Sequence, residues 1–195
     1  MQPSYEEKKE KFSRIRKKPH HVPPHLHNAI ELVYVTKGEL ELGVGYELYH
    51  MEKGDFAVVF PDLIHHYQVF SKESNEVYQI YASLELSGPF MALLQKKCPE
   101  NPVIKKENLP YEIKNSLECL ISGEKVNEIV GQAYLQIILY QCNNMLQFIE
   151  KDRVGSNDLI YSVMTCLLSH FQEELTLGSV AEALGINKFA LSKVF

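Results

Sequence analysis

Between residues 30 and 85 the chain alternates hydrophobic and polar positions over short stretches separated by turn-forming residues. This period of two is typical of β-strands with one face on a core, because successive side chains of a strand point to opposite sides. Six strands are predicted, at 30–36, 39–44, 46–51, 56–60, 65–70 and 76–85. Glycines such as Gly38 and Gly54 mark the turns. Short strands at this spacing predict an antiparallel barrel or jelly roll.

After Gly88 the pattern becomes helical. Helices are expected over 90–97, over 110–122 and, as the longest, over 124–150. The longest of these helices carries two apolar stripes. The first comprises Val126, Val130, Ala133, Ile137 and Tyr140, and the second comprises Leu135, Ile138, Leu139, Cys142, Leu146 and Ile149. One stripe can cover the barrel. The other needs a partner, which is either a second copy of the chain in a homodimer or the helix over 110–122.

Polar segments flank this mainly β body. The charged start of the chain predicts a mobile arm, either solvated or folded over the barrel. A polar, glycine-containing linker precedes a helix that begins near residue 159 and is capped by Ser156, Asn157 or Asp158. The expected organisation is an arm at 1–22, a barrel at 23–87, a helical part at 88–150, a linker at 151–158 and a second domain at 159–195.

Composition narrows the class of protein. The 195 residues allow one sizeable domain and part of another, and 45% hydrophobic with 23% charged residues is ordinary for a soluble globular protein. No apolar run reaches about eighteen residues, and the polar start lacks a secretory signal, so we expect a cytoplasmic protein with no membrane contact. The four cysteines have no Cys-x-x-Cys spacing, which favours free thiols over disulfides or a zinc knuckle.

Three side chains with metal-binding chemistry lie before and at the start of the first predicted strand. His25, His27 and Glu31 share one parity with Val33 and Val35. In one continuous strand all five would face the same way, with a polar mouth in front of an apolar interior. Two imidazoles and a carboxylate suit a first-row divalent metal, and a histidine from a second strand would complete the set.

The spacing His25-x-His27-x3-Glu31-x6-Gly38 resembles the first motif of the cupin superfamily at every fixed position. The resemblance implies a cupin barrel.

The second cupin motif is matched in part. Counting from Gly54, its histidine falls on His65, but Phe60 stands where the motif has proline and Asp62 where it has glycine. His66 is a competing candidate for the fourth ligand.

Residues 175–195 resemble the first helix-turn-helix of the AraC family of transcription regulators. The matching positions are Leu177, Ala181, Leu184, Gly185, Ile186, Asn187, Leu191, Ser192, Lys193, Val194 and Phe195. In this reading Thr176 caps the first helix and Gly185 supplies the positive φ of the turn. The resemblance implies a cupin sensor domain followed by DNA-binding units, with this chain truncated within the first of them.

The same resemblance implies a DNA-binding set of five residues near the start of a recognition helix. They are Asn187, Lys188, Phe189, Ser192 and Lys193, with Asn187 as the cap and Lys193 nearer phosphate. The net charge of −5 opposes a surface built wholly for nucleic acid, so a second unit would have to carry most of the phosphate-binding charge.

The resemblance also implies what the barrel binds. His25, His27, Glu31 and His65 would hold one divalent transition metal, such as zinc, nickel, iron or manganese, which in turn holds an oxygen-bearing effector. Alternatively the four residues form a polar patch that binds the effector directly or has no role. Tyr67 shares the parity of His65 and is expected to contact the ligand, for which a sugar is one candidate.

The resulting hypothesis is a dimeric, non-enzymatic transcription regulator that senses a small molecule and binds a DNA operator. The alternative is a cupin metalloenzyme of the dioxygenase or sugar isomerase type, with open metal positions for its substrate. A third possibility is a stand-alone binding protein in which the C-terminal element only packs.

Overall fold

The computed structural model describes residues 3–45, 47–71, 74–122, 127–151 and 175–188, together with 163, 166 and 191. The chain divides into two compact units, 1–151 and 152–195, which are described separately. None of the helices in the described part combines the length and apolar character of a membrane span.

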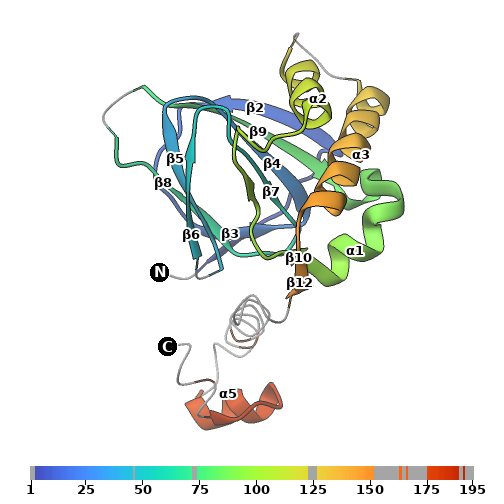
Figure 1. The fold of residues 1–195 in the computed structure, drawn as a ribbon. Helices are drawn as coiled ribbons and strands as arrows, with labels where there is room; N and C mark the ends of the chain where they lie inside the picture. Colours follow the sequence, from blue (N-terminus) through green and yellow to red (C-terminus); the bar gives the residue numbers. More distant parts are fainter. Residues whose placement is uncertain are drawn as a thin grey trace. The chain divides into compact units, whose positions relative to one another are not determined.

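Two five-stranded sheets face each other in the first unit (Figure 1). The order in one is β1 (Ser4–Glu6), β3 (Val22–His27), β8 (His65–Gln68), β5 (Glu39–Val44) and β6 (Glu47–Glu52). The order in the other is β11 (Val103–Ile104), β7 (Phe56–Val59), β4 (Ala29–Lys37), β9 (Glu76–Ser83) and β2 (Phe12–Lys17). All pairings within them are antiparallel except that of β1 with β3. The predicted mainly β, cupin-like fold is therefore confirmed.

The core lies between the sheets and also behind the second one. The first seven residues of β4 are all buried. Val33 and Val35 share the parity of Glu31, whose side chain meets the other sheet, so they face that sheet. The residues between them face the side that the helices cover (Figure 1). A strand covered on both faces loses the polar alternation of a half-exposed strand.

The N-terminal residues correct the prediction of an arm separate from the barrel. β1 pairs with β3 and β2 pairs with β9, so both strands belong to the sheets. Their side chains are mostly half-buried or exposed. Both are edge strands, and edge strands often carry charged side chains. These charges led to the prediction of a solvated arm.

The expectation of one continuous strand from His25 to Val35 was wrong. The chain leaves β3 after His27, passes through Asn28 and enters β4 in the other sheet. The histidines and Glu31 therefore approach one another from two facing sheets.

Helices cover the outer face of the β4 sheet. They are η1 (Leu84–Phe90), α1 (Met91–Lys96), α2 (Tyr111–Ile121) and α3 (Glu128–Met145). The long helix ends five residues earlier than predicted, because β12 (Phe148–Glu150) pairs with β10 (Lys97–Pro99). The predicted helix start at 124 lies outside the described residues.

The two apolar stripes of α3 have different environments. Leu135, Ile138, Leu139 and Cys142 of the second stripe are buried. Val130, Ala133, Ile137 and Tyr140 of the first stripe are exposed. α2 therefore does not cover the first stripe in the described part of the chain.

The second unit has its own small core. Val163, Cys166, Val180, Ala181 and Leu191 are buried together. α5 (Leu177–Ala183) begins with a capping box between Thr176 and Ser179, as expected for Thr176, and Gly185 follows with φ +65°. Residues 152–158 of the predicted linker, which include the expected caps, and most of the helix from 159 lie outside the described residues.

Leu120 provides a test of the helix packing. It is fully buried in α2, so we expect Leu120→Ala to lower the free energy of unfolding by about 2–5 kcal/mol through lost burial and an unfilled cavity. The matched control is Leu48→Ala, at a side chain that is 50% exposed, which should change it by less than about 0.5 kcal/mol. Urea denaturation measures both. Equal effects would contradict the packing of α2 on the barrel.

Candidate metal centre

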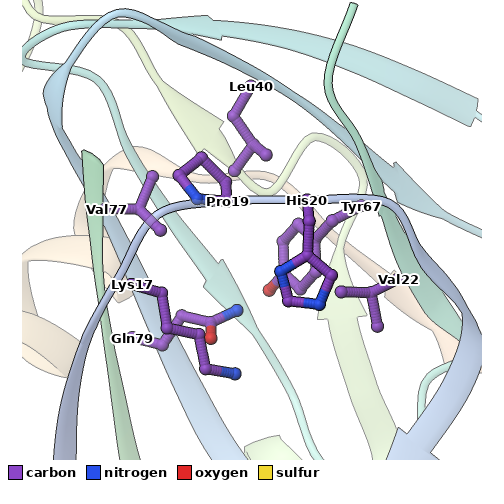
Figure 2. A pocket seen from close by; sticks show the side chains of 8 residues that line it. All are labelled: Lys17, Pro19, His20, Val22, Leu40, Tyr67, Val77 and Gln79. Carbon is purple, nitrogen blue, oxygen red and sulfur yellow. The ribbon is translucent and has the colours of Figure 1, made fainter. Parts of the chain in front are cut away.

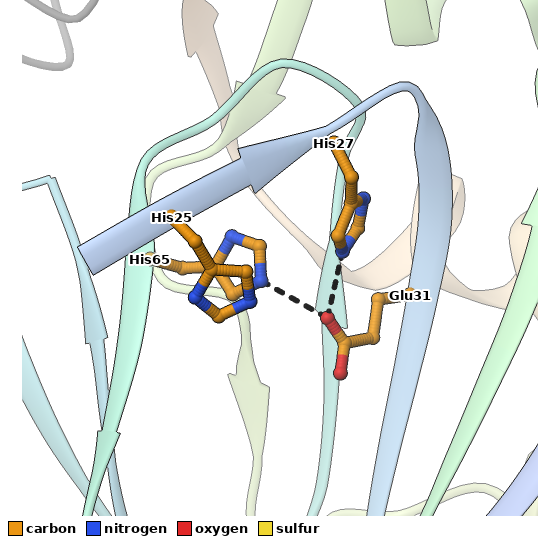
Figure 3. Close-up of side chains that lie close together, drawn as sticks. All are labelled: His25, His27, Glu31 and His65. Atoms are coloured by element: carbon orange, nitrogen blue, oxygen red, sulfur yellow. Dashed lines mark hydrogen bonds and ion pairs between the residues drawn. The ribbon is translucent and has the colours of Figure 1, made fainter. Parts of the chain in front are cut away.

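Three histidines and one glutamate meet between the sheets (Figure 3). His25 and His27 lie on β3, His65 lies opposite His25 on β8, and Glu31 comes from β4 of the facing sheet. One ligand atom from each lies within 4.8 Å of every other, and all four side chains are buried. The structure thus brings together the four residues that the sequence predicted.

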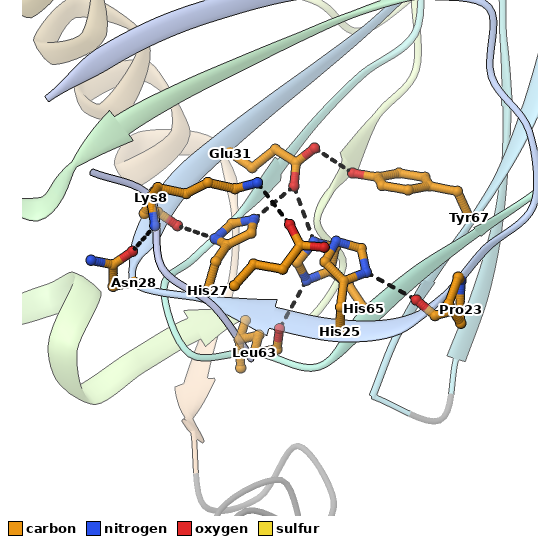
Figure 4. Close-up of polar contacts among 11 residues, drawn as sticks. Lys8, Pro23, His25, His27, Asn28, Glu31, Leu63, His65 and Tyr67 are labelled. Atoms are coloured by element: carbon orange, nitrogen blue, oxygen red, sulfur yellow. Dashed lines mark hydrogen bonds and ion pairs between the residues drawn. The ribbon is translucent and has the colours of Figure 1, made fainter. Parts of the chain in front are cut away.

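Each imidazole is held through Nδ1 by a backbone carbonyl two residues away (Figure 4). The distances are 3.0 Å from His25 to Pro23, 3.0 Å from His27 to Ala29 and 2.9 Å from His65 to Leu63. A carbonyl only accepts, so Nδ1 carries the proton in each ring and Nε2 is left for the centre. A hydrogen bond of this kind is the usual support of a metal-binding histidine.

The ligand atoms fit a first-row divalent ion. His27 Nε2 and His65 Nε2 each lie 3.0 Å from Glu31 Oε2. Two ligands at right angles around an ion, with bonds of about 2.1 Å, are about 3 Å apart. Opposite ligands would be about 4.2 Å apart. The four ligand atoms lie within 4.8 Å of one another, so they would move together only slightly on binding an ion. A bound ion would supply a positive charge able to hold an oxygen ligand.

Burial and charge set the protonation of the centre. Burial opposes the charge of Glu31, but hydrogen bonds from His27 and His65 hold the pKa of its carboxyl well below the usual value. Burial, followed by the nearby His65, lowers the pKa of His25 to about 4, so this ring is neutral at neutral pH. Without a metal, a hydrogen bond from Nε2 to Glu31 requires a second proton on the ring. A divalent ion would replace these protons.

Tyr67 contacts the remaining oxygen of Glu31. Its hydroxyl donates to Oε1 at 2.7 Å. Burial and the charge of Glu31 raise the pKa of Tyr67 well above its ordinary value, so the phenol stays protonated and remains a donor. Tyr67 thus orients the carboxylate.

The competing candidate His66 lies elsewhere. Its ring is packed so closely over Gly43 that a Cβ at that glycine would lie 1.9 Å from Cε1 of His66. His66 is therefore excluded from the centre, because neighbouring residues of a strand point to opposite faces.

The structure adds residues that the sequence analysis missed. Glu6 is paired with His27 across β1 and β3, and Lys8 Nζ lies 2.8 Å from Glu6 (Figure 4). Lys8 Nζ also lies 4.4 Å from the centre of the Tyr81 ring. The centres of the Tyr81 and His27 rings are 5.4 Å apart in an edge-to-face arrangement. The only signal for Tyr81 would have been its register opposite Glu31, which requires knowing that β4 pairs with β9.

A small pocket, in part open to solvent, lies beside Tyr67 (Figure 2). Its apolar lining consists of Pro19, Val22, Leu40 and Val77. Its polar lining includes Lys17, His20, Tyr67 and Gln79. Tyr67 therefore belongs both to the pocket and to the surroundings of Glu31.

The predicted DNA-contacting residues are described only in part. Asn187 and Lys188 are exposed in the segment after Gly185, and Lys188 is helical. Phe189, Ser192 and Lys193 lie outside the described residues.

Two facing sheets with a histidine and glutamate cluster between them define a cupin-like binding domain. Residues 12–141 match the AraC-like ligand binding domain, and the chain belongs to this family. No curated protein matches the sequence.

Solved structures resemble the chain in fold. ToxT from Vibrio cholerae matches with a TM-score of 0.52 and 13% identity, over 94% of this chain and 74% of ToxT. The AraC-like transcriptional activator CuxR matches with a TM-score of 0.45 and 13% identity, over 84% and 59% of the two chains. An RmlC-like cupin from Methanocaldococcus jannaschii matches with 0.33 and 19%, over 37% and 68%.

The centre should make the metal-free protein sensitive to acid. The pKa of His25 is near 4 in the folded chain and about 6.5 in the unfolded chain, so between about pH 6.5 and about pH 4 mainly the unfolded chain binds this proton. Glu31 adds a further loss below its unfolded pKa of about 4.3, because its folded pKa is lowered. The free energy of unfolding should therefore fall as the pH falls, by at most about 1.4 kcal/mol per pH unit for each proton.

The His25→Gln variant isolates the first of these effects. Urea denaturation between about pH 7 and about pH 5 should give a shallower decline than in the parent protein, because glutamine does not titrate. Identical slopes would show that His25 does not titrate as its burial requires.

Proposed function

We propose that this protein is a ligand-responsive transcription regulator. The observation that carries the proposal is the match of residues 12–141 to an AraC-like ligand binding domain whose barrel holds a buried polar cluster beside a pocket. Binding of a small effector in the barrel would favour one of two conformations. The second unit would then meet an operator differently in each.

A divalent transition ion, such as zinc, nickel, iron or manganese, would be bound by His25, His27, Glu31 and His65. Its role would be to hold the effector or to brace the two sheets at one end. The three carbonyl contacts that orient the rings support this assignment, because a polar patch that binds effector directly would need no such common orientation. A sugar or other hydroxylated molecule would find a polar contact at Tyr67.

The DNA contacts are assigned to the segment that follows α5. Thr176 caps α5 and Gly185 ends it, which leaves Asn187 and Lys188 exposed where a recognition helix would begin. The N-terminal residues of a recognition helix contact bases in helix-turn-helix proteins. Phe189, Ser192 and Lys193 would complete the surface.

A metalloenzyme remains the second candidate because of the same cluster. An enzyme needs open positions on its metal that substrate can reach. The four side chains are at most 4% exposed, and Tyr67 occupies the second oxygen of Glu31. This enclosure favours a binding and sensing role over turnover.

The DNA-binding assignment is tested by selecting duplexes from a random pool with the purified protein. We then expect Lys188→Ala to weaken binding to the selected duplex by about 5- to 100-fold, since a base or phosphate contact is worth about 1–3 kcal/mol. Lys37→Ala, at an exposed lysine in the barrel, should have no effect. Fluorescence anisotropy measures both. An unchanged affinity in Lys188→Ala would remove this residue from the DNA-binding surface.

A further inference from the structure

The amide of Gln79 is only half satisfied. Gln79 lies on β9, is 4% exposed and lines the pocket beside the metal centre. Its Oε1 is buried and has no hydrogen-bond partner among the residues that the structure describes. A buried polar atom without a partner costs about 1–3 kcal/mol, so such an atom facing a pocket marks a place for a ligand group.

The neighbouring Tyr67 is consistent with Oε1 as the free end of the amide. The carboxylate of Glu31 accepts from the Tyr67 hydroxyl. That hydroxyl has used its only proton, so its oxygen can only accept from the amide N–H of Gln79. Gln79 therefore presents an acceptor, and the complementary ligand group is a donor such as a hydroxyl.

The rest of the pocket adds a charge requirement. Lys17, half-buried at the end of β2, is among its lining residues, and none of the described lining residues is acidic. The lining also includes Leu40 and Val77, both buried and apolar. A short carbon chain with an anionic group at one end would be complementary to this arrangement.

We propose that the pocket binds a small hydroxy acid, with its hydroxyl donating to Gln79 Oε1 and its carboxylate beside Lys17. This inference rests on the proposed sensing function and names the chemical class of the effector, to which sugar acids belong. The size of the pocket limits the ligand to a short chain. Tyr67, which lines the pocket and donates to Glu31, also connects the ligand to the metal centre.

Three probes separate the two recognition elements. They are 5-hydroxypentanoate, pentanoate, which lacks the hydroxyl, and pentane-1,5-diol, which lacks the charge. In NMR titrations of the unmodified protein we expect the hydroxy acid to bind about tenfold more tightly than either of the others, because each lost contact is worth about 1–1.5 kcal/mol. Failure of the hydroxy acid to bind at millimolar concentration, or equal binding of all three, would overturn the proposal.

Two variants assign the contacts. Gln79→Met should abolish the preference for the hydroxyl and leave pentanoate binding within about twofold, whereas Gln68→Met, outside the pocket, should preserve it. Lys17→Met should weaken both acids by about five- to tenfold and leave the diol unchanged, with Lys18→Met as its control.

The outcome is independent of DNA binding. A hydroxyl preference that survives in Gln79→Met would overturn the assignment, and if that variant did not fold, the three probes on the unmodified protein would still decide. Loss of operator selection with intact probe binding would count against the regulator and not against the pocket.

Discussion

We expect the His27→Ala variant to lose its metal. After dialysis against buffer without chelator, the parent protein should retain close to one divalent ion per chain by inductively coupled plasma mass spectrometry. The variant should retain less than about a tenth of that amount, since even outer contacts of a metal site change affinity by about 10- to 100-fold. Among the four candidate ligands, His27 has one of the two 3.0 Å contacts with Glu31.

The physical reason is the balance of charge between the sheets. In the metal-free state Glu31 is stabilised by hydrogen bonds from His27 and His65. A bound ion would take over this role with its two positive charges. Without His27, fewer ligands would offset the loss of the ion's hydration shell. The parent protein should also unfold at a higher temperature when zinc is added, because binding to the folded state alone stabilises it.

His21→Ala is the matched control. It removes an exposed histidine that lies before the centre on the same segment and should leave the metal content unchanged. Equal metal in the parent protein and in His27→Ala would contradict the site. So would the absence of any retained ion after zinc, nickel, iron and manganese had each been supplied.

The sequence predicted the barrel because its alternation is strong between residues 30 and 85. The predicted strands at 39–44 and 56–60 agree with β5 and β7 to within one residue at either end. β1 and β2 were missed because edge strands next to solvent carry charges. In β2, Arg14 and Arg16 stand among the apolar residues Phe12 and Ile15, so no hydrophobic alternation is visible. β12 was read as helix because Ile149 continues the period of α3.

The candidate site was predictable in its members but not in its geometry. His25, His27 and Glu31 are separated by two and four positions, and parity alone placed them on one strand. The break at Asn28 sends them to two sheets, and only the pairing of β3 with β8 places His65 opposite His25. Glu6, Lys8 and Tyr81 come from strands whose register no local pattern reveals.

Two parts of the first unit could transmit an effector signal. Tyr67 lines the pocket and donates to Glu31, so it connects the pocket to the candidate metal centre across both sheets. α3 packs beside α2 and η1, so a shift in the barrel wall would move its exposed face. The oligomeric state of the protein therefore bears directly on how sensing would work.

We expect the protein to be a homodimer through α3, and Ile137→Glu to dissociate it. The exposed fractions are 46% at Val130, 41% at Ile137 and 56% at Tyr140. With Ala133 these residues recur at the spacing of a single helix face, and an apolar stripe of this kind on a helix that already buries its other stripe marks an interface. A two-fold dimer buries each substituted residue twice, so the penalty of one buried charge is doubled.

The expected increase in the dimer dissociation constant is at least about 100-fold, equivalent to about 3 kcal/mol. Analytical ultracentrifugation measures it, and circular dichroism should show an unchanged fold because Ile137 already meets solvent in the single chain. Asn143→Glu, which adds the same charge to α3 about a third of a turn away from Ile137, should leave the dimer intact. A monomeric parent protein, or a dimer that tolerates Ile137→Glu, would mean that the stripe serves another partner and that regulation does not act through pairing of α3.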